Sequence, residues 1–76
     1  DLQGAIEYHR QHLALAQKLG LRASESDAWG NLGQVHAEQG DIEQAMACYQ
    51  KQLALVQEIQ DLPREGDALS NLGDTC

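Results

Sequence analysis

The sequence predicts an all-α protein, a short solenoid of helix-turn-helix units. Residues 1–36 align without a gap on residues 41–76 with twelve identical pairs, so the chain carries an internal repeat of forty residues. Within each copy, apolar residues recur with the 3.6-residue period of a helix. Leucine and alanine are abundant, whereas β-branched residues are few and there is a single proline. Together these observations favour stacked helices over any sheet.

The length and composition set the scale of the fold. Seventy-six residues make at most one small domain, in the range where a single core is marginal. A hydrophobic content of 42% argues against intrinsic disorder. With one Trp, two Tyr and no Phe, the core must be built from many small aliphatic contacts.

The charge balance excludes two classes of partner. Twelve acidic and five basic residues give a net charge of −7. Nucleic-acid binding depends on Lys and Arg at phosphates, and anionic membrane surfaces also attract basic segments, so neither partner is expected. No apolar run approaches the roughly 18 residues that span a bilayer. An electrostatically favoured partner is a basic peptide.

The first helix is expected over residues 2–19, with Gly20 as its C-terminal stop. Its apolar stripe falls at positions i, i+3, i+4, i+7, i+11 and i+14. The stripe contains Leu2, Ala5, Ile6, His9, Leu13 and Ala16.

A second helix is expected from about residue 25 to 39, with Ser24 and Asp27 forming a capping box at its start. It carries an apolar side and a polar stripe at i, i+4, i+7 and i+11. The apolar side is Ala28, Trp29, Leu32, Gly33, Val35 and His36, and the polar stripe is Asp27, Asn31, Gln34 and Glu38.

The turn at Gly40-Asp41 leads into a third helix, about residues 42–60, that repeats the first. Pro63 suits the first turn of a fourth helix, which runs to the end of the sequence. This helix is expected to place Ala68, Leu69, Leu72 and Gly73 inward and Asp67, Asn71 and Asp74 outward. The expected order is thus long helix, shorter helix, long helix and truncated shorter helix.

These residues resemble the tetratricopeptide repeat over the whole chain. The positions that match its signature are Trp29, Leu32, Gly33, Gly40, Ala45 and Tyr49, with Ala5, Leu72 and Gly73 as their counterparts in the other copy. The departures are Leu69 at the tryptophan position and His9, His36 and Cys76 at aromatic positions. The resemblance implies that residues 1–22 end one repeat, 23–62 form a complete repeat, and 63–76 begin the next.

The forty-residue period with Asn-Leu-Gly is similar to a subclass found in the Leu-Gly-Asn-enriched spindle-orientation scaffolds and in rapsyn-like proteins. Kinesin light chains are a more distant likeness. In this pattern Gly33 is expected to lack a side chain where Ala45 approaches, so that the paired helices lie close together. Each pair leaves an apolar face that a neighbouring pair covers.

The polar stripe is the candidate binding site of the sequence. It contains Asp27, Asn31, Gln34 and Glu38, and its repeat contains Asp67, Asn71 and Asp74. Gly30 and Ser70 beside it would keep the groove floor open. A carboxamide offers a donor and an acceptor, so it can bind a peptide main chain whatever the side chains. The resemblance implies this role for Asn31 and Asn71, on the concave face of a solenoid.

Two other interpretations of the chain stay open at this point. The stripe can be a solvated helix face, in which case the segment is a structural spacer with no ligand. The segment can also self-associate through the uncovered faces of its terminal helices. Otherwise the expected function is protein–protein interaction, with an extended and basic peptide as partner.

No catalytic site, metal site or cofactor is predicted. His9 and His12 lie one helical turn apart, but no third ligand has a suitable spacing. Cys48 has no base placed to activate it, and a structural thiol is favoured. Cys48 and Cys76 are too few for a disulfide framework, although a bond between them is open, and a reducing, cytoplasmic setting is expected.

Overall fold

The structure, a computed structural model, describes residues 1–75, and the side chains of residues 1–73. It contains four helices within that range: α1 (Leu2–Leu19), α2 (Arg22–Glu38), α3 (Ile42–Glu58) and α4 (Leu62–Thr75). No strand occurs in the described residues. The predicted all-α fold class is therefore confirmed.

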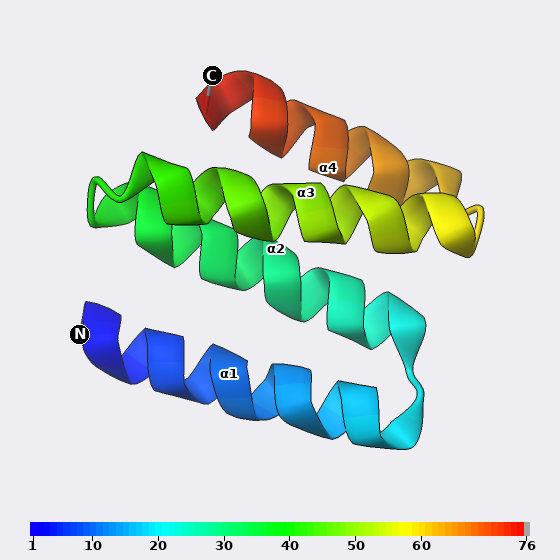
Figure 1. The fold of residues 1–76 in the computed structure, drawn as a ribbon, viewed down its shortest axis with the longest axis horizontal. Helices are drawn as coiled ribbons and strands as arrows, with labels where there is room; N and C mark the ends of the chain where they lie inside the picture. Colours follow the sequence, from blue (N-terminus) through cyan, green and yellow to red (C-terminus); the bar gives the residue numbers. More distant parts are fainter. Residues whose placement is uncertain (76) are drawn as a thin grey trace.

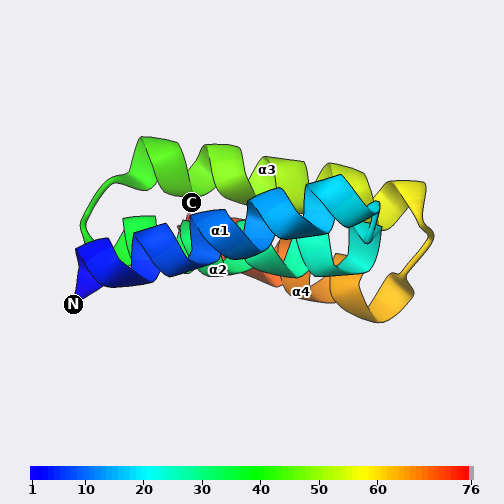
Figure 2. The ribbon, with the colours of Figure 1, turned by 90° about the horizontal axis from the view of Figure 1, so that it is seen from below.

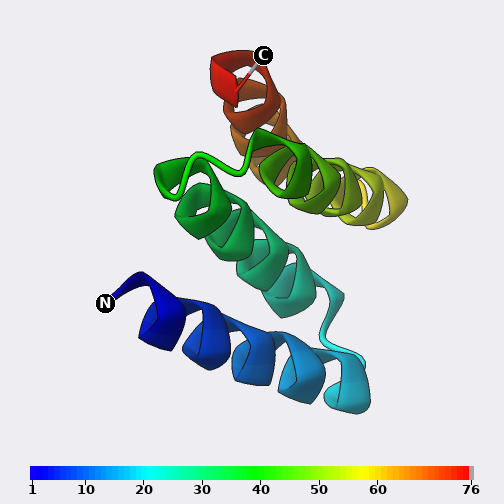
Figure 3. The ribbon, with the colours of Figure 1, turned by 60° about the vertical axis from the view of Figure 1, so that its left-hand side comes forward.

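The helices stack in the order of the sequence. Figure 1 shows them as a row from α1 to α4, with α1 and α4 at opposite ends. Seen from below, α3 lies on one side of the layer and α2 and α4 on the other (Figure 2). Figure 3, turned about the vertical axis from the view of Figure 1, shows the same zigzag of successive antiparallel helices. Because α2 and α4 lie on one side, their exposed faces can form a common surface.

Two glycines make the sharp turns that this stacking needs. Gly20 has φ 70° and Gly40 has φ 80°, in the left-handed region that glycine adopts at little cost. Asp1 and Asp41 occupy equivalent positions of the repeat and cap α1 and α3. Their side chains accept hydrogen bonds from the backbone amides of Gly4 and Gln44. The predicted bounds of the first helix and the predicted turn at Gly40-Asp41 are confirmed.

The expected capping box at the start of the second helix is wrong. Helix α2 begins at Arg22, and Leu21 precedes it with no side-chain cap. The chain enters α2 directly from the turn at Gly20, because the Leu21 amide still donates to Ala16 O of α1 at 2.9 Å. Ser24 thus lies inside the helix. As a result α2 has 17 residues, as many as α3, and the expected length contrast is small.

The α3–α4 connection has no glycine. Gln60 occupies the position equivalent to Gly20 and adopts φ 58°, so α3 ends at Glu58, two residues before the expected limit. Asp61 then caps α4 by accepting from the Arg64 amide at 3.2 Å. Pro63 lies in the first turn of α4, as predicted.

The core lies between successive helices and is centred on α2. Its buried cluster contains Ile6, Leu13, Ala28, Leu32, Val35 and Cys48, with Ala5 and Trp29 packed against it. The closest approach at Gly33 is that of Tyr49, because a Cβ at Gly33 would overlap the Tyr49 ring. Tyr49 is itself 3% exposed. The glycine is thus needed to admit a buried aromatic ring.

Two residues of α4 differ from their expected inward placement. Leu69 is 54% exposed, and a Cβ at Gly73 would meet no atom within 4 Å. Their counterparts Trp29 and Gly33 are covered by α3, but no helix of the described residues packs on the corresponding side of α4. Ala68 is fully buried, as expected.

Candidate functional site

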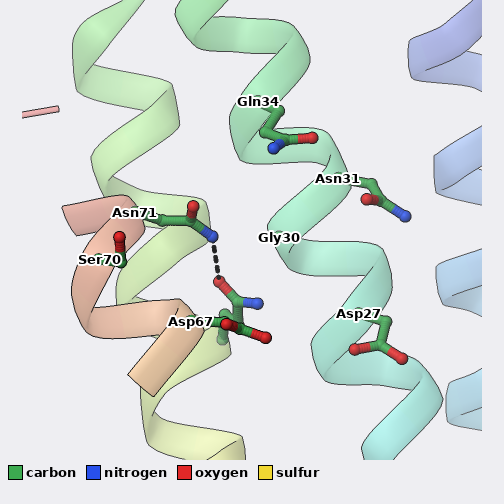
Figure 4. Close-up of a pocket in the computed structure, with 8 residues that line it drawn as sticks. Asp27, Gly30, Asn31, Gln34, Asp67, Ser70 and Asn71 are labelled. Carbon is green, nitrogen blue, oxygen red and sulfur yellow. Dashed lines mark hydrogen bonds between the residues drawn. The ribbon is translucent and has the colours of Figure 1, made fainter. Parts of the chain in front are cut away.

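A polar groove runs between α2 and α4, with α3 as its floor. Its volume is about 520 Å³. Helix α2 contributes Asp27, Gly30, Asn31 and Gln34, helix α4 contributes Asp67, Ser70 and Asn71, and α3 contributes Gln52. Figure 4 shows the lining residues of α2 and α4 on these two helices. The repeat positions of α2 and α4 therefore form one site.

Gln52 joins the floor of the groove to its α4 wall. The Asn71 side-chain amide donates to Gln52 Oε1 at 3.3 Å, as the dashed line in Figure 4 marks. Gln52 is only 5% exposed, and its amide passes where a Cβ at Gly30 would lie 2.5 Å from Nε2. Gly30 is thus the residue that allows a buried amide to reach the groove.

Asn31 is the α2 counterpart of Asn71 and faces a different neighbour. Its side chain is partly buried and points away from Asn71, toward α1 (Figure 4). No hydrogen bond is recorded for the Asn31 amide among the described residues. Both hydrogen-bonding ends of this carboxamide are therefore available to a ligand.

Arg64 forms an ion-pair bridge to Asp27, one of the residues that line the groove. Its guanidinium binds both oxygens of Asp27, Nε to Oδ1 at 3.0 Å and Nη2 to Oδ2 at 3.2 Å. The remaining Nη1 donates to Asp61 Oδ2 at 2.6 Å. Such a two-pronged pair fixes orientation, and it links α4 to α2. Asp27 is therefore already paired with a positive charge of the same chain.

The bridge makes stability depend on pH. The hydrogen bond from the Arg64 side chain holds the pKa of Asp61 below its ordinary value. The stabilisation is full above the ordinary aspartate pKa of about 3.9 and is lost as pH falls through the lower folded value. We expect Asp61→Asn, which can still cap α4, to melt below the wild type at neutral pH, with the difference shrinking in acid.

This prediction is checked by thermal unfolding of both proteins across the acid range. Asp67→Asn serves as the matched control, because Asp67 is an exposed carboxylate with no recorded ion pair among the described residues. A difference between wild type and Asp61→Asn that stays constant with pH would contradict the role of the charge.

The structure places most of the predicted stripe in the groove. Asp27, Asn31, Gln34, Asp67 and Asn71 all line it. Glu38 is exposed but is not among the lining residues. The side chain of Asp74 lies outside the described residues.

The sequence analysis did not single out Gln52, which lines the groove, or Arg64, which pairs with the groove residue Asp27. The sequence does indicate Gln52. Ala45, Tyr49, Gln52 and Val56 fall at i, i+4, i+7 and i+11 on one side of the helix, so Gln52 is a polar residue on an apolar, inward side. No such pattern indicates Arg64, since its repeat counterpart is Ser24. Its partner Asp27 is 37 residues away in sequence.

The other candidate groups form no second site. Cys48 is a buried free thiol, and burial raises its pKa above the ordinary value, which disfavours the nucleophilic thiolate. Cys76, the other residue of the disulfide considered above, lies outside the described residues. Among the described residues, no three His, Cys, Asp or Glu side chains gather as a metal site would need, and no helix is both long and apolar enough to span a bilayer.

Comparison with known proteins agrees with the repeat. The family model described as tetratricopeptide repeat matches residues 1–51 and again residues 24–76. G-protein-signaling modulator 1 of Homo sapiens is 41% identical over 46 residues, which are 60% of this chain and 7% of that protein. The chain thus spans a small part of the length of the relative that it matches. Because the two family matches together cover all 76 residues, the chain belongs to the tetratricopeptide repeat family.

Proposed function

We propose that the groove between α2 and α4 binds an extended peptide segment of a partner protein. Repeats of this family serve protein–protein interaction, and stacked repeats create extended concave surfaces. The observation that carries the proposal is the set of carboxamides from three helices, Asn31, Gln34, Gln52 and Asn71, that line one groove. A row of donors and acceptors suits a peptide main chain, which alternates N–H and C=O groups.

The bond between Asn71 and Gln52 supports a role in positioning. Holding one amide against a buried one fixes its orientation before a ligand arrives, which lowers the entropy cost of binding. Asn31 has no such restraint recorded, so we assign it the more adaptable contact. Gly30 leaves room for the Gln52 amide between the two helices.

The charge of the groove favours a basic segment. Asp67 is exposed on the α4 wall, and the whole chain carries −7. Asp27 contributes less than the sequence indicated, because Arg64 already neutralises it. We therefore propose that a Lys or Arg of the partner lies nearer to Asp67 than to Asp27.

The similarity to a G-protein-signaling modulator adds only a general expectation. We propose for this chain a binding role within a protein assembly, without catalysis and inside the cell. The alternative is a structural spacer that binds nothing, in which the groove is a solvated surface. The titration below separates the two functions.

The test begins with a peptide selected from a random display library on the wild-type protein. Calorimetric titration of that peptide is then repeated with the double variant Asn31→Ala/Asn71→Ala. Losing two hydrogen bonds of about 1 kcal/mol each should weaken binding roughly 30-fold. Circular dichroism should report unchanged helicity, since both side chains lie on the groove surface.

The matched control is Gln50→Ala/Gln57→Ala, which removes two exposed amides of α3 outside the groove. It should bind like the wild type. The wild-type affinity should also fall as salt rises, and Asp67→Asn should reduce that dependence. Equal affinities for the wild type and the Asn31/Asn71 variant would contradict the proposal. Failure to select any peptide would favour the alternative function, a structural spacer.

A further inference from the structure

The forty-residue repeat relates α3 to α1 and α2 to α4, and this relation exposes two matching faces. The most extensive helix packing in the chain is that of α2 on α3. Helix α4 carries the counterparts of the α2 residues in that contact, and α1 carries the counterparts of the α3 residues. In the described residues, α1 and α4 do not touch each other. The chain therefore carries a second pair of faces equivalent to those of the α2–α3 contact, and these two faces are not in contact with each other.

The α4 half consists of a projecting side chain beside an open glycine. Leu69, 54% exposed, is the counterpart of Trp29. In α2, Trp29 packs against the core, and Lys51 of α3 covers its ring with Nζ 4.6 Å from the ring centroid. Gly73, with nothing within 4 Å, is the counterpart of the glycine that admits the Tyr49 ring.

The α1 half is a hollow of about 260 Å³ lined by Tyr8, Gln11, His12 and Leu15. Tyr8 and Leu15 are 66% and 55% exposed. The counterparts of these four residues on α3 are Cys48, Lys51, Gln52 and Leu55. Cys48 is buried in the core, and Lys51 and Gln52 are the residues that contact Trp29 and adjoin Gly30. The hollow on α1 is thus equivalent to the part of α3 that contacts α2 around Trp29.

We propose that α4 of one copy packs on α1 of a second copy, in the same geometry in which α2 packs on α3 within the chain. Leu69 then enters the hollow beside Gln11, and His9, the counterpart of Tyr49, lies over Gly73. The Ser70 hydroxyl faces His12, where a hydrogen bond can replace the close contact of Gly30 with Gln52. A second copy is the occupant because this one chain supplies both complementary faces.

This contact joins two different surfaces, so it does not close on itself. Each added copy leaves one free α1 face and one free α4 face, and the copies extend in a row. The proposal goes beyond the peptide groove, since Ser70 is the one groove-lining residue that takes part in the contact. Burial of Leu69, Tyr8 and Leu15 would supply the hydrophobic stabilisation.

The test is sedimentation velocity of the 76-residue protein over a wide range of concentration. The wild type should form species larger than a dimer as concentration rises. Leu69→Glu and Leu15→Glu should each remain monomeric, since each blocks one face. An equimolar mixture of the two variants should form a dimer that grows no further, because each variant keeps the face that the other lacks.

Ile42→Glu is the matched control, since Ile42 is 47% exposed on α3 and belongs to neither face. It should associate like the wild type. Circular dichroism of dilute samples verifies folding, and Leu69→Gln and Leu15→Gln replace any variant that loses helicity. A wild type that stays monomeric would overturn the proposal. So would association of Leu69→Glu alone, or a mixture that stays monomeric.

Discussion

Replacing Leu32 with alanine should remove a large part of the stability of the fold. Leu32 is 3% exposed at the centre of the core, where it packs with residues of α1 and α3. Leu→Ala at such a site costs about 2–5 kcal/mol, through lost burial and the cavity left behind. A domain of this length has a free energy of unfolding on the order of 4–10 kcal/mol. Urea unfolding followed by circular dichroism should therefore report a strongly lowered midpoint.

The repeat supplies the control for this experiment. Leu72 has the same neighbours in sequence, Asn and Gly, but it is only partly buried. Leu72→Ala should lower the midpoint less than Leu32→Ala does, because it removes less buried surface. Equal losses for the two variants would show that α2 is not the centre of the core.

Gly33→Ala should destabilise the protein even though alanine favours helices. The new methyl group would overlap a ring carbon of Tyr49, which is buried and has no free space to enter. Overpacking of this kind costs about 1–3 kcal/mol, which exceeds the gain in helix propensity of about 1 kcal/mol. The expected result is a lowered thermal midpoint and a changed near-ultraviolet signal from Tyr49.

Gly73→Ala should have the opposite sign. This glycine is the repeat counterpart of Gly33, lies in α4 and faces open space. Only the propensity term applies there, so dilute protein should gain up to about 1 kcal/mol. If both substitutions stabilised the protein, the close contact between α2 and Tyr49 would not limit the packing.

The sequence allowed the helices and most turns to be predicted, and the errors have local causes. Glycines at 20 and 40 mark their turns, because only glycine adopts a positive φ easily. The end of α3 was placed late because Gln60 adopts that conformation without being glycine. The start of α2 was placed late because Leu21 gives no side-chain cap that a pattern can reveal.

The residues of the candidate site that recur with the forty-residue period could be predicted from the sequence. Those brought together only by contacts between helices could not. Asn31 and Asn71 share a repeat position, so a single helical stripe located both. The bridge from Arg64 to Asp27 joins different repeat positions on two helices, which no periodicity relates. It alters the charge of the groove, so the electrostatic prediction needed the structure.

The order of the helix contacts has a consequence for folding. Within the part of the chain that the structure describes, each helix packs only on its neighbours in sequence, apart from a minor contact of α2 with α4. Such local topology shortens the loops that must close, and it favours fast folding. It also lets an end helix detach while the others stay packed, so opening can be partial. Because α4 forms one wall of the groove, a ligand bound there would hold α4 in place, and occupancy of the site would be coupled to the folding of the last helix.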